Sequence, residues 1–346
     1  MGGYTCLCAI VSEDLWKIGQ LRPGCTIQFR RVTFAQAVSM IGIRECYFEQ
    51  LSQVISGSEP PNVNVCHELF TASWEPSLQD PKLHVIFASD PRPMVVFRQA
   101  GDSAILVEYG ERKLDFRLRA RIHAFETELR KRDIAGVWQL APCIRSTMIH
   151  YDPAVISQSD LLRTLIQVET GLPDSLSEIV FPARRITFPI VLDDRWNRQA
   201  LERYMRSMRD EAVYLPSNIA YLARNNGLEG GADEALQLLV SSDWCSLQLV
   251  FGVGFYDACP FLIPGAVGIA GLVAAIYPIE SPGGYQLFGR TLPAWQTWGK
   301  GRGFSLQKPW LLQPFDQVHF EPVTEEQYVE MESQFDAGRY IFKRSR

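Results

Sequence analysis

The chain has 346 residues, of which 47% are hydrophobic and 21% charged, so a folded protein with a sizeable core is expected. Its 34 Lys and Arg residues are interspersed with 39 Asp and Glu residues, without the basic stripe that binding to nucleic acid requires. The most apolar stretch, Phe261–Ile279, is interrupted by Pro264 and Pro278, which argues against a membrane span. These features exclude nucleic acid and membrane as expected partners.

The eight cysteines contain no CxxC pair, and residues 1–12 lack the cationic start and apolar run of a signal peptide. We therefore expect reduced thiols and a cytoplasmic protein.

The two ends of the chain share a sequence plan. Gly2-Gly3-Tyr4 and Gly283-Gly284-Tyr285 are each followed by a short aromatic segment, a proline turn and an alternating apolar pattern. The pattern predicts strands containing Ile27 and Phe29 near the start, and Val318 and Phe320 near the end. Residues 1–33 are therefore interpreted as the remnant of a companion β domain.

The remaining chain divides by composition and periodicity. Residues 34–93 open with a helical pattern over 34–55 and continue as a proline-rich stretch, interpreted as a linker. Residues 94–183 predict a small α+β subdomain, with strands over 95–97, 104–109 and 145–151, a helix carrying Leu118 to Leu129, and a helix over 157–169.

Residues 184–346 predict a strand over 184–192, helices over 195–209 and 217–226, and then short strands punctuated by Gly and Pro. The expected fold class is α+β with a closed or nearly closed β barrel.

Common catalytic signatures are absent from the sequence. No phosphate loop, dinucleotide fingerprint, HExxH helix or GxSxG elbow occurs. We expect no metal site.

His150 is the first candidate for proton transfer. Strand alternation over 145–151 places it with Ser146 and Met148 on one face, and Arg145 with Ile149 on the other. An imidazole at a sheet edge can exchange a proton near neutral pH. The alternative interpretation is a half-buried histidine that serves only the fold.

A second group of candidates comes from two later segments. Pro216-Ser217-Asn218 begins a predicted helix, where Ser217 can serve as N-cap and Asn218 lies in the first turn. Gly283 and Gly284 allow close approach of a ligand or another backbone, and Tyr285 and Gln286 follow them. Helix capping and plain turn geometry are the alternatives.

Taken together, these segments resemble the carboxyltransferase region of urea carboxylase (urea amidolyase). The resemblance rests on stretches in this order: Phe97–Gly110, Ile144–Pro153, Pro216–Ile219, Val267–Gly271 and Tyr277–Thr291. A similar domain occurs in a 5-oxoprolinase subunit and in a sporulation kinase inhibitor. Residues 2–31 resemble the end of the companion domain, and both domains are cyclophilin-like barrels in that family.

The resemblance implies transfer of a carboxyl group from carboxybiotin to urea or a similar amide. His150 would transfer a proton or contact the urea oxygen, and Asn218 would orient the substrate. Ser217, Gly283, Gly284, Tyr285, Gln286 and Arg145 are the implied substrate contacts. These stretches are expected to converge on one pocket.

The chain contains no biotin-attachment motif and no ATP-grasp half. The resemblance therefore implies that biotin is carried by a partner carrier, together with a biotin carboxylase or a companion barrel chain. Two alternatives remain: a divergent stand-alone enzyme for another small molecule, and a non-catalytic subunit or inhibitory module of a 5-oxoprolinase-like pair.

Overall fold

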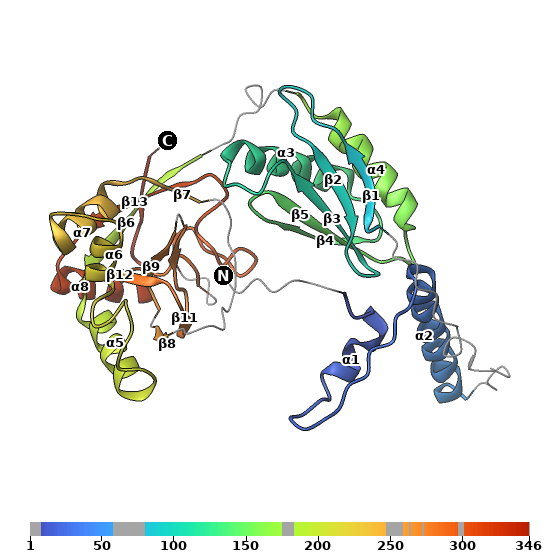
Figure 1. Cartoon of the computed structure of the whole chain (residues 1–346), viewed down its shortest axis with the longest axis horizontal. Coiled ribbons are helices and arrows are strands. Elements are labelled where there is room, and N and C mark those ends of the chain that lie inside the picture. Colours follow the sequence, from blue (N-terminus) through green and yellow to red (C-terminus); the bar gives the residue numbers. More distant parts are fainter. Residues whose placement is uncertain are drawn as a thin grey trace. The chain divides into compact units, whose positions relative to one another are not determined.

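The computed structural model describes residues 8–57, 80–174, 183–246, 259–262, 264–271, 273–296 and 301–345. The chain separates into two compact units, one of residues 5–180 and one built mainly of residues 181–346 (Figure 1). None of the described helices combines the length and apolarity needed to cross a membrane.

The first unit contains a five-stranded antiparallel sheet. Its order is β1 (Lys82–Ile86), β2 (Val95–Gln99), β3 (Ala104–Tyr109), β5 (Ser146–Tyr151) and β4 (Val137–Pro142). Helices α3 (Phe116–Arg132) and α4 (Gln158–Gly171) cover one face (Figure 1), and their apolar stripes share a core with alternate strand residues. The other face of this sheet, which carries His150, is called the open face below.

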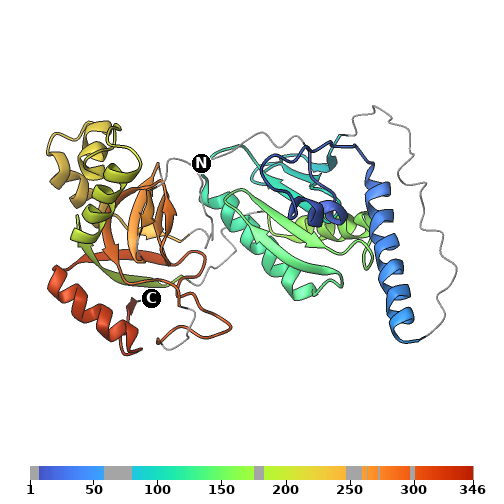
Figure 2. The same cartoon turned by 90° about the horizontal axis from the view of Figure 1, so that it is seen from below.

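The predicted helix over residues 34–55 is confirmed as α2 (Phe34–Ile55) (Figure 2). It begins at a capping box, in which Thr33 Oγ1 accepts from the Gln36 N–H and Gln36 Oε1 accepts from the Thr33 N–H. However, β1 pairs with β2 inside the range expected to be a linker, so residues 82–86 belong to the sheet.

The N-terminal segment differs from the prediction. It contains η1 (Ser12–Asp14) and α1 (Leu15–Ile18), and residues 26–31 form no strand. Ile27 and Phe29 are exposed because no strand in the described part of the chain pairs with them. Ser12 instead joins this segment to the small sheet, since its N–H and hydroxyl both donate to the Asp102 carboxylate.

The second unit is built on a mixed sheet ordered β10-β9-β12-β6-β13-β7, with β14 also paired to β6. The bounds are β6 (Arg185–Leu192), β7 (Trp244–Cys245), β9 (Ala266–Ala270), β10 (Val273–Ile276), β12 (Gln286–Thr291), β13 (Gln317–Pro322) and β14 (Lys343–Ser345). A separate pair consists of β8 (Cys259–Leu262) and β11 (Ser281–Gly283).

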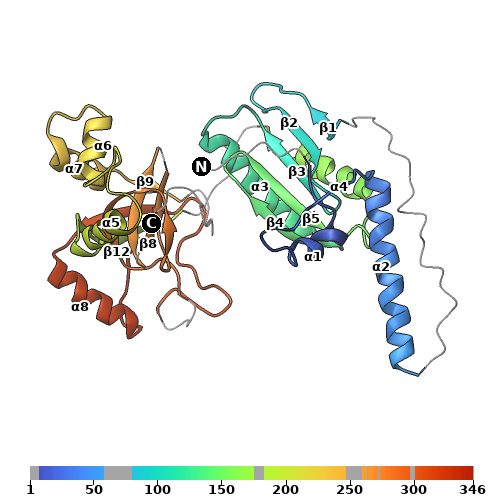
Figure 3. The ribbon, with the colours of Figure 1, turned by 60° about the horizontal axis from the view of Figure 1, so that its bottom comes forward.

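Among the residues that the structure describes, four helices accompany this sheet: α5 (Arg195–Ser207), α6 (Asn218–Asn225), α7 (Gly231–Ser241) and α8 (Glu325–Asp336). Helices α6 and α7 lie on one side of the sheet and α8 on the other (Figure 3). The predicted strand containing Val318 and Phe320 is confirmed as β13, where both side chains are buried. Within the described residues no pairing joins β10 to β7, so the fold is mixed α/β with two main sheets and the closed barrel is not confirmed.

Candidate active site

Ser217 and Asn218 lie at the start of α6. The Ser217 hydroxyl accepts a hydrogen bond from the Ala220 N–H at 3.2 Å, so Ser217 acts as the helix N-cap. The Ser217 oxygen is therefore used as an acceptor within the helix cap. This agrees with helix capping, which was the alternative to substrate binding for Ser217.

The carboxamide of Asn218 links three segments of the second unit. The side chain is 4% exposed; its Oδ1 accepts from the Leu287 N–H at 2.8 Å, and its Nδ2 donates to the Tyr214 carbonyl at 3.1 Å. Both ends of the amide are therefore used by the fold, and they fix α6 beside the start of β12. Asn218 lies next to the strand that carries Gln286.

Gln286 is the first residue of β12, and its carbonyl oxygen is unusual. The Oε1 atom is buried and has no hydrogen-bond partner among the described residues. Most buried polar atoms in proteins are hydrogen-bonded, and leaving one unpaired costs about 1–3 kcal/mol. An N–H donor from a bound amide would satisfy this atom.

The turn before Gln286 is packed against neighbouring strands. Gly283 is buried in β11, Gly284 is exposed, and the Tyr285 ring meets the Tyr277 ring edge-on with centroids 6.3 Å apart. Gly268 allows this packing, because a Cβ there would lie 2.8 Å from the Tyr285 Cβ.

His150 lies on β5 of the first unit, on the open face. Burial alternates along β5 as predicted, with Ile149 and Tyr151 in the core and His150 half-buried. The Trp138 ring packs against the imidazole with centroids 5.0 Å apart. Burial lowers the pKa of His150 below 6.5, so the ring is mainly neutral at pH 7 and can accept a proton.

Arg145 is held in a charge cluster at the end of β3. Its guanidinium pairs with Glu108 and donates to the Tyr109 and Gly110 carbonyls at 3.2 and 3.3 Å. Arg98 pairs with the other oxygen of Glu108. Burial alone would raise the pKa of Glu108, but the Arg98 hydrogen bond and the Arg145 charge outweigh it and lower the pKa.

The sheet register separates Arg145 from His150. Glu108, which holds Arg145, is opposite Ser146, whereas His150 is opposite Ala104. Four residues along a strand correspond to about 13 Å. The two side chains therefore do not share one pocket. The separation runs along the sheet: Arg145 precedes β5 and pairs with Glu108, which lies on the open face with His150, so the opposite faces expected from strand alternation are not found. A substrate contact by Arg145 stays a prediction.

The structure brings Asn218 together with the segment of Gln286 in the second unit, whereas His150 and Arg145 belong to the first. Convergence of the two groups stays a prediction. Sequence reasoning missed Glu108, Trp138, Tyr214 and Leu287. Strand alternation over 104–109 could have placed Glu108 on the open face. Tyr214 lies only four residues before Asn218, whereas the contact with Leu287 is set by tertiary packing.

Comparison with known proteins assigns the chain to a family. The family model for the carboxyltransferase domain, subdomain C and D, matches residues 95–302, more than half of the chain. The chain belongs to the carboxyltransferase-domain family. A second model, for subdomain A and B of the same domain, matches residues 1–31. The resemblance inferred from the motifs is confirmed.

Individual relatives agree with this assignment. The chain is 32% identical to a putative urea carboxylase of Emericella nidulans, covering 99% of this chain and 30% of that protein. It is 30% identical to the urea amidolyase of Saccharomyces cerevisiae, covering 98% of this chain and 19% of that protein. This carboxyltransferase-domain chain thus spans less than a third of the length of either relative.

A solved structure shows the same fold. The crystal structure of Kluyveromyces lactis urea carboxylase matches 97% of this chain and 30% of that chain, with 30% identity and a TM-score of 0.76. The carboxyltransferase-domain chain therefore corresponds to one region of that Kluyveromyces lactis protein.

Proposed function

We propose that this carboxyltransferase-domain chain binds a urea-type amide and presents one amide nitrogen for carboxylation. The proposal rests on the buried Oε1 of Gln286, which lacks a hydrogen-bond donor among the described residues. Urea offers N–H donors in a planar, neutral molecule and satisfies such an acceptor without burying a net charge.

Asn218 supports this role from behind the site. By accepting from the Leu287 N–H, it fixes the backbone beside Gln286, so the glutamine carbonyl is held before substrate binds. Preorganised polar groups of this kind position a substrate without reorganisation during reaction. Asn218 is therefore assigned a positioning role, in place of direct substrate contact.

His150 is assigned proton transfer in the same reaction. Its lowered pKa keeps the imidazole neutral at physiological pH, which is the form that accepts a proton. Removing a proton from an amide nitrogen makes that nitrogen a better nucleophile toward carboxyl carbon. The half-buried position beside Trp138 also limits access of water to the ring.

The unpaired acceptor of Gln286 also fits biotin, the cofactor that the family implies. A ureido N–H, present both in urea and in the biotin ring, is the donor that Gln286 Oε1 lacks. Carboxybiotin, when bound, would supply the carboxyl group. The chain's own residues would accept the amide N–H, orient the nitrogen and accept its proton.

Companion domains are part of this proposal. The match of residues 1–31 to subdomain A and B favours further A and B subdomains, and a biotin carrier and carboxylase, in companion domains or chains. The proposal includes a cytoplasmic location and the cyclophilin-like barrel expected for residues 184–346.

The proposal is tested by supplying the chain with separately produced biotin carboxylase, biotin carrier and subdomains A and B. We expect ATP-dependent fixation of labelled bicarbonate that requires urea or a small amide. His150→Ala should reduce the rate at least 100-fold, since general base catalysis contributes about 10²–10⁴. His84→Ala, a change on β1, is the matched control and should leave the rate unchanged.

Absence of amide-dependent fixation in the complete mixture would contradict the proposal and favour the non-catalytic alternative. Equal rates for wild type and His150→Ala would remove His150 from the reaction.

A further inference from the structure

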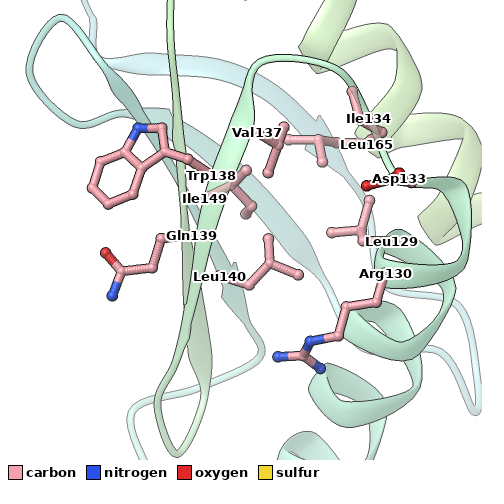
Figure 4. Close-up of a pocket in the computed structure, with 10 residues that line it drawn as sticks. All are labelled: Leu129, Arg130, Asp133, Ile134, Val137, Trp138, Gln139, Leu140, Ile149 and Leu165. Carbon is pink, nitrogen blue, oxygen red and sulfur yellow. The ribbon is translucent and has the colours of Figure 1, made fainter. Parts of the chain in front are cut away.

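A cavity of about 360 Å³ lies in the first unit, between the end of α3 and the edge strand β4 (Figure 4). Its volume falls at the lower end of the range of small-molecule sites. The floor is aliphatic and consists mainly of Leu129, Val137, Leu140, Ile149 and Leu165. Because side chains alternate along β5, Ile149 faces this cavity and His150 faces the opposite side of the sheet. The cavity and His150 therefore lie on opposite faces of the sheet, although Trp138, which packs against His150, also belongs to the cavity lining.

The edge of β4 is poorly suited to pairing with another strand. The register shifts between Val137 and Gln139, which is a bulge, and Pro142 lacks an N–H. The Cys143 N–H donates to the Ser146 carbonyl of β5, and successive N–H groups of a strand point to alternate sides. In the regular part of β4, only the Leu140 N–H is therefore directed away from β5, where a further strand would pair. Bulges and prolines are common devices against strand addition. A small molecule fits this cavity better than an extended peptide.

Two opposite charges lie where α3 ends at the cavity. Arg130 belongs to the last turn of α3 and Asp133 is its C-cap residue, with Leu129 between their side chains in Figure 4. The Arg130 guanidinium is 55% exposed and lies 3.8 Å from Glu126, beyond a normal hydrogen bond, while the other Glu126 oxygen accepts from Thr147 at 2.8 Å. Among the described residues, no ion pair is found for Asp133. Both charges can therefore bind a ligand.

We propose that this cavity binds the zwitterion of a large apolar amino acid. The ligand carboxylate pairs with Arg130, the ligand ammonium pairs with Asp133, and the apolar side chain lies on the half-buried Val137 and Leu140. Arg130 is in the last turn of α3, Asp133 is the C-cap residue that follows it with φ +43°, and both line the cavity, so a ligand with two opposite charges on one Cα can contact both. Asp133 would repel a carboxylic acid that lacks an ammonium group, and Arg130 would repel an amine that lacks a carboxylate.

Isothermal titration of the full chain with L-leucine and L-phenylalanine tests the proposal. We expect saturable binding of at least one of them, with stoichiometry near one. Arg130→Gln and Asp133→Asn should each weaken binding at least tenfold, because each removes a charged partner of the ligand. Arg132→Gln, an exposed cation on the same helix turn, is the matched control and should change affinity less than twofold.

Ligand analogues provide a test that does not depend on the variants. Leucinamide lacks the carboxylate and 4-methylpentanoate lacks the ammonium, so both should bind at least tenfold more weakly than L-leucine. Equal binding of 4-methylpentanoate, affinities unchanged in both charge variants, or no saturable binding of either amino acid would overturn the proposal. His150→Ala should leave leucine binding unchanged, which separates this site from the proposed carboxyl transfer.

Discussion

The Leu287 N–H donates a hydrogen bond to Asn218 Oδ1 across 69 positions of sequence, at a distance of 2.8 Å. Leu287 is 3% exposed, so water cannot replace this acceptor without opening the packing between α6 and β12. This hydrogen bond thus connects the start of α6 to Leu287 of β12, the residue after Gln286, whose side-chain Oε1 is unpaired among the described residues.

Replacing Asn218 with alanine should therefore destabilise the second unit. The change leaves the Leu287 N–H buried without an acceptor, which costs about 2 kcal/mol. Guanidinium chloride unfolding measures the difference. Asn226→Ala, which removes an exposed amide at the other end of the same helix, should cost less than about 1 kcal/mol. Equal losses in both variants would show that the bond to Leu287 contributes no more than the surface one.

The titration of His150 is a second test. Because burial lowers its folded-state pKa, its NMR titration midpoint should lie below 6.5. Below that pH the unfolded state binds more protons, so this group's contribution to the free energy of unfolding falls as the pH decreases. Trp138→Ala removes the ring that covers the imidazole and should shift the midpoint upward. A midpoint above 6.5 in the wild type would contradict the assignment of burial as the cause.

Glu108 should give a pH dependence in a lower range. Its folded-state pKa lies below 4.5 because Arg98 and Arg145 stabilise the carboxylate, so its contribution to stability is complete above the unfolded pKa. That contribution is lost as the pH falls through the folded-state pKa. Glu108→Gln should lose about 2 kcal/mol at pH 7. Its unfolding free energy should approach that of the wild type in acid; a constant difference from pH 7 to pH 2 would exclude this linkage.

Gly265 should tolerate no side chain. Its φ is +85°, and an added Cβ would lie 2.1 Å from the Thr291 carbonyl oxygen. Gly265→Ala should cost more than about 3 kcal/mol because backbone strain and a backbone clash combine. Gly271 has φ +59° but open space around it, so Gly271→Ala isolates the strain and should cost about 1 kcal/mol. Equal thermal unfolding midpoints for the two variants would contradict the clash.

Local sequence signals predicted the elements with regular periodicity and clear ends. The strand over 104–109 and the helix over 34–55 agree with β3 and α2, since the hydrophobic pattern of each is a local feature. The sequence interpretation missed β1, β4, α7 and α8. For β1 the proline-rich surroundings suggested a linker, and its strand state depends on pairing with β2.

The strand predicted around Ile27 and Phe29 shows the limit of periodicity. Alternation alone cannot stabilise an extended segment, since a strand requires a hydrogen-bonded neighbour. The candidate site shows the same limit. Motifs identified Asn218 and Gln286, but only the fold shows that the Asn218 side chain accepts from the Leu287 N–H and that the Gln286 Oε1 has no donor among the described residues.

The most direct test of the proposed function is the KM for urea of Gln286→Leu in the reconstituted carboxyl-transfer reaction, with Gln317→Leu on the exposed face of β13 as the matched control. Loss of the buried acceptor should raise this KM at least tenfold, because a substrate N–H loses its partner on binding. The control should leave it unchanged. A wild-type KM for urea in folded Gln286→Leu would contradict amide recognition by Gln286, and with it the central claim.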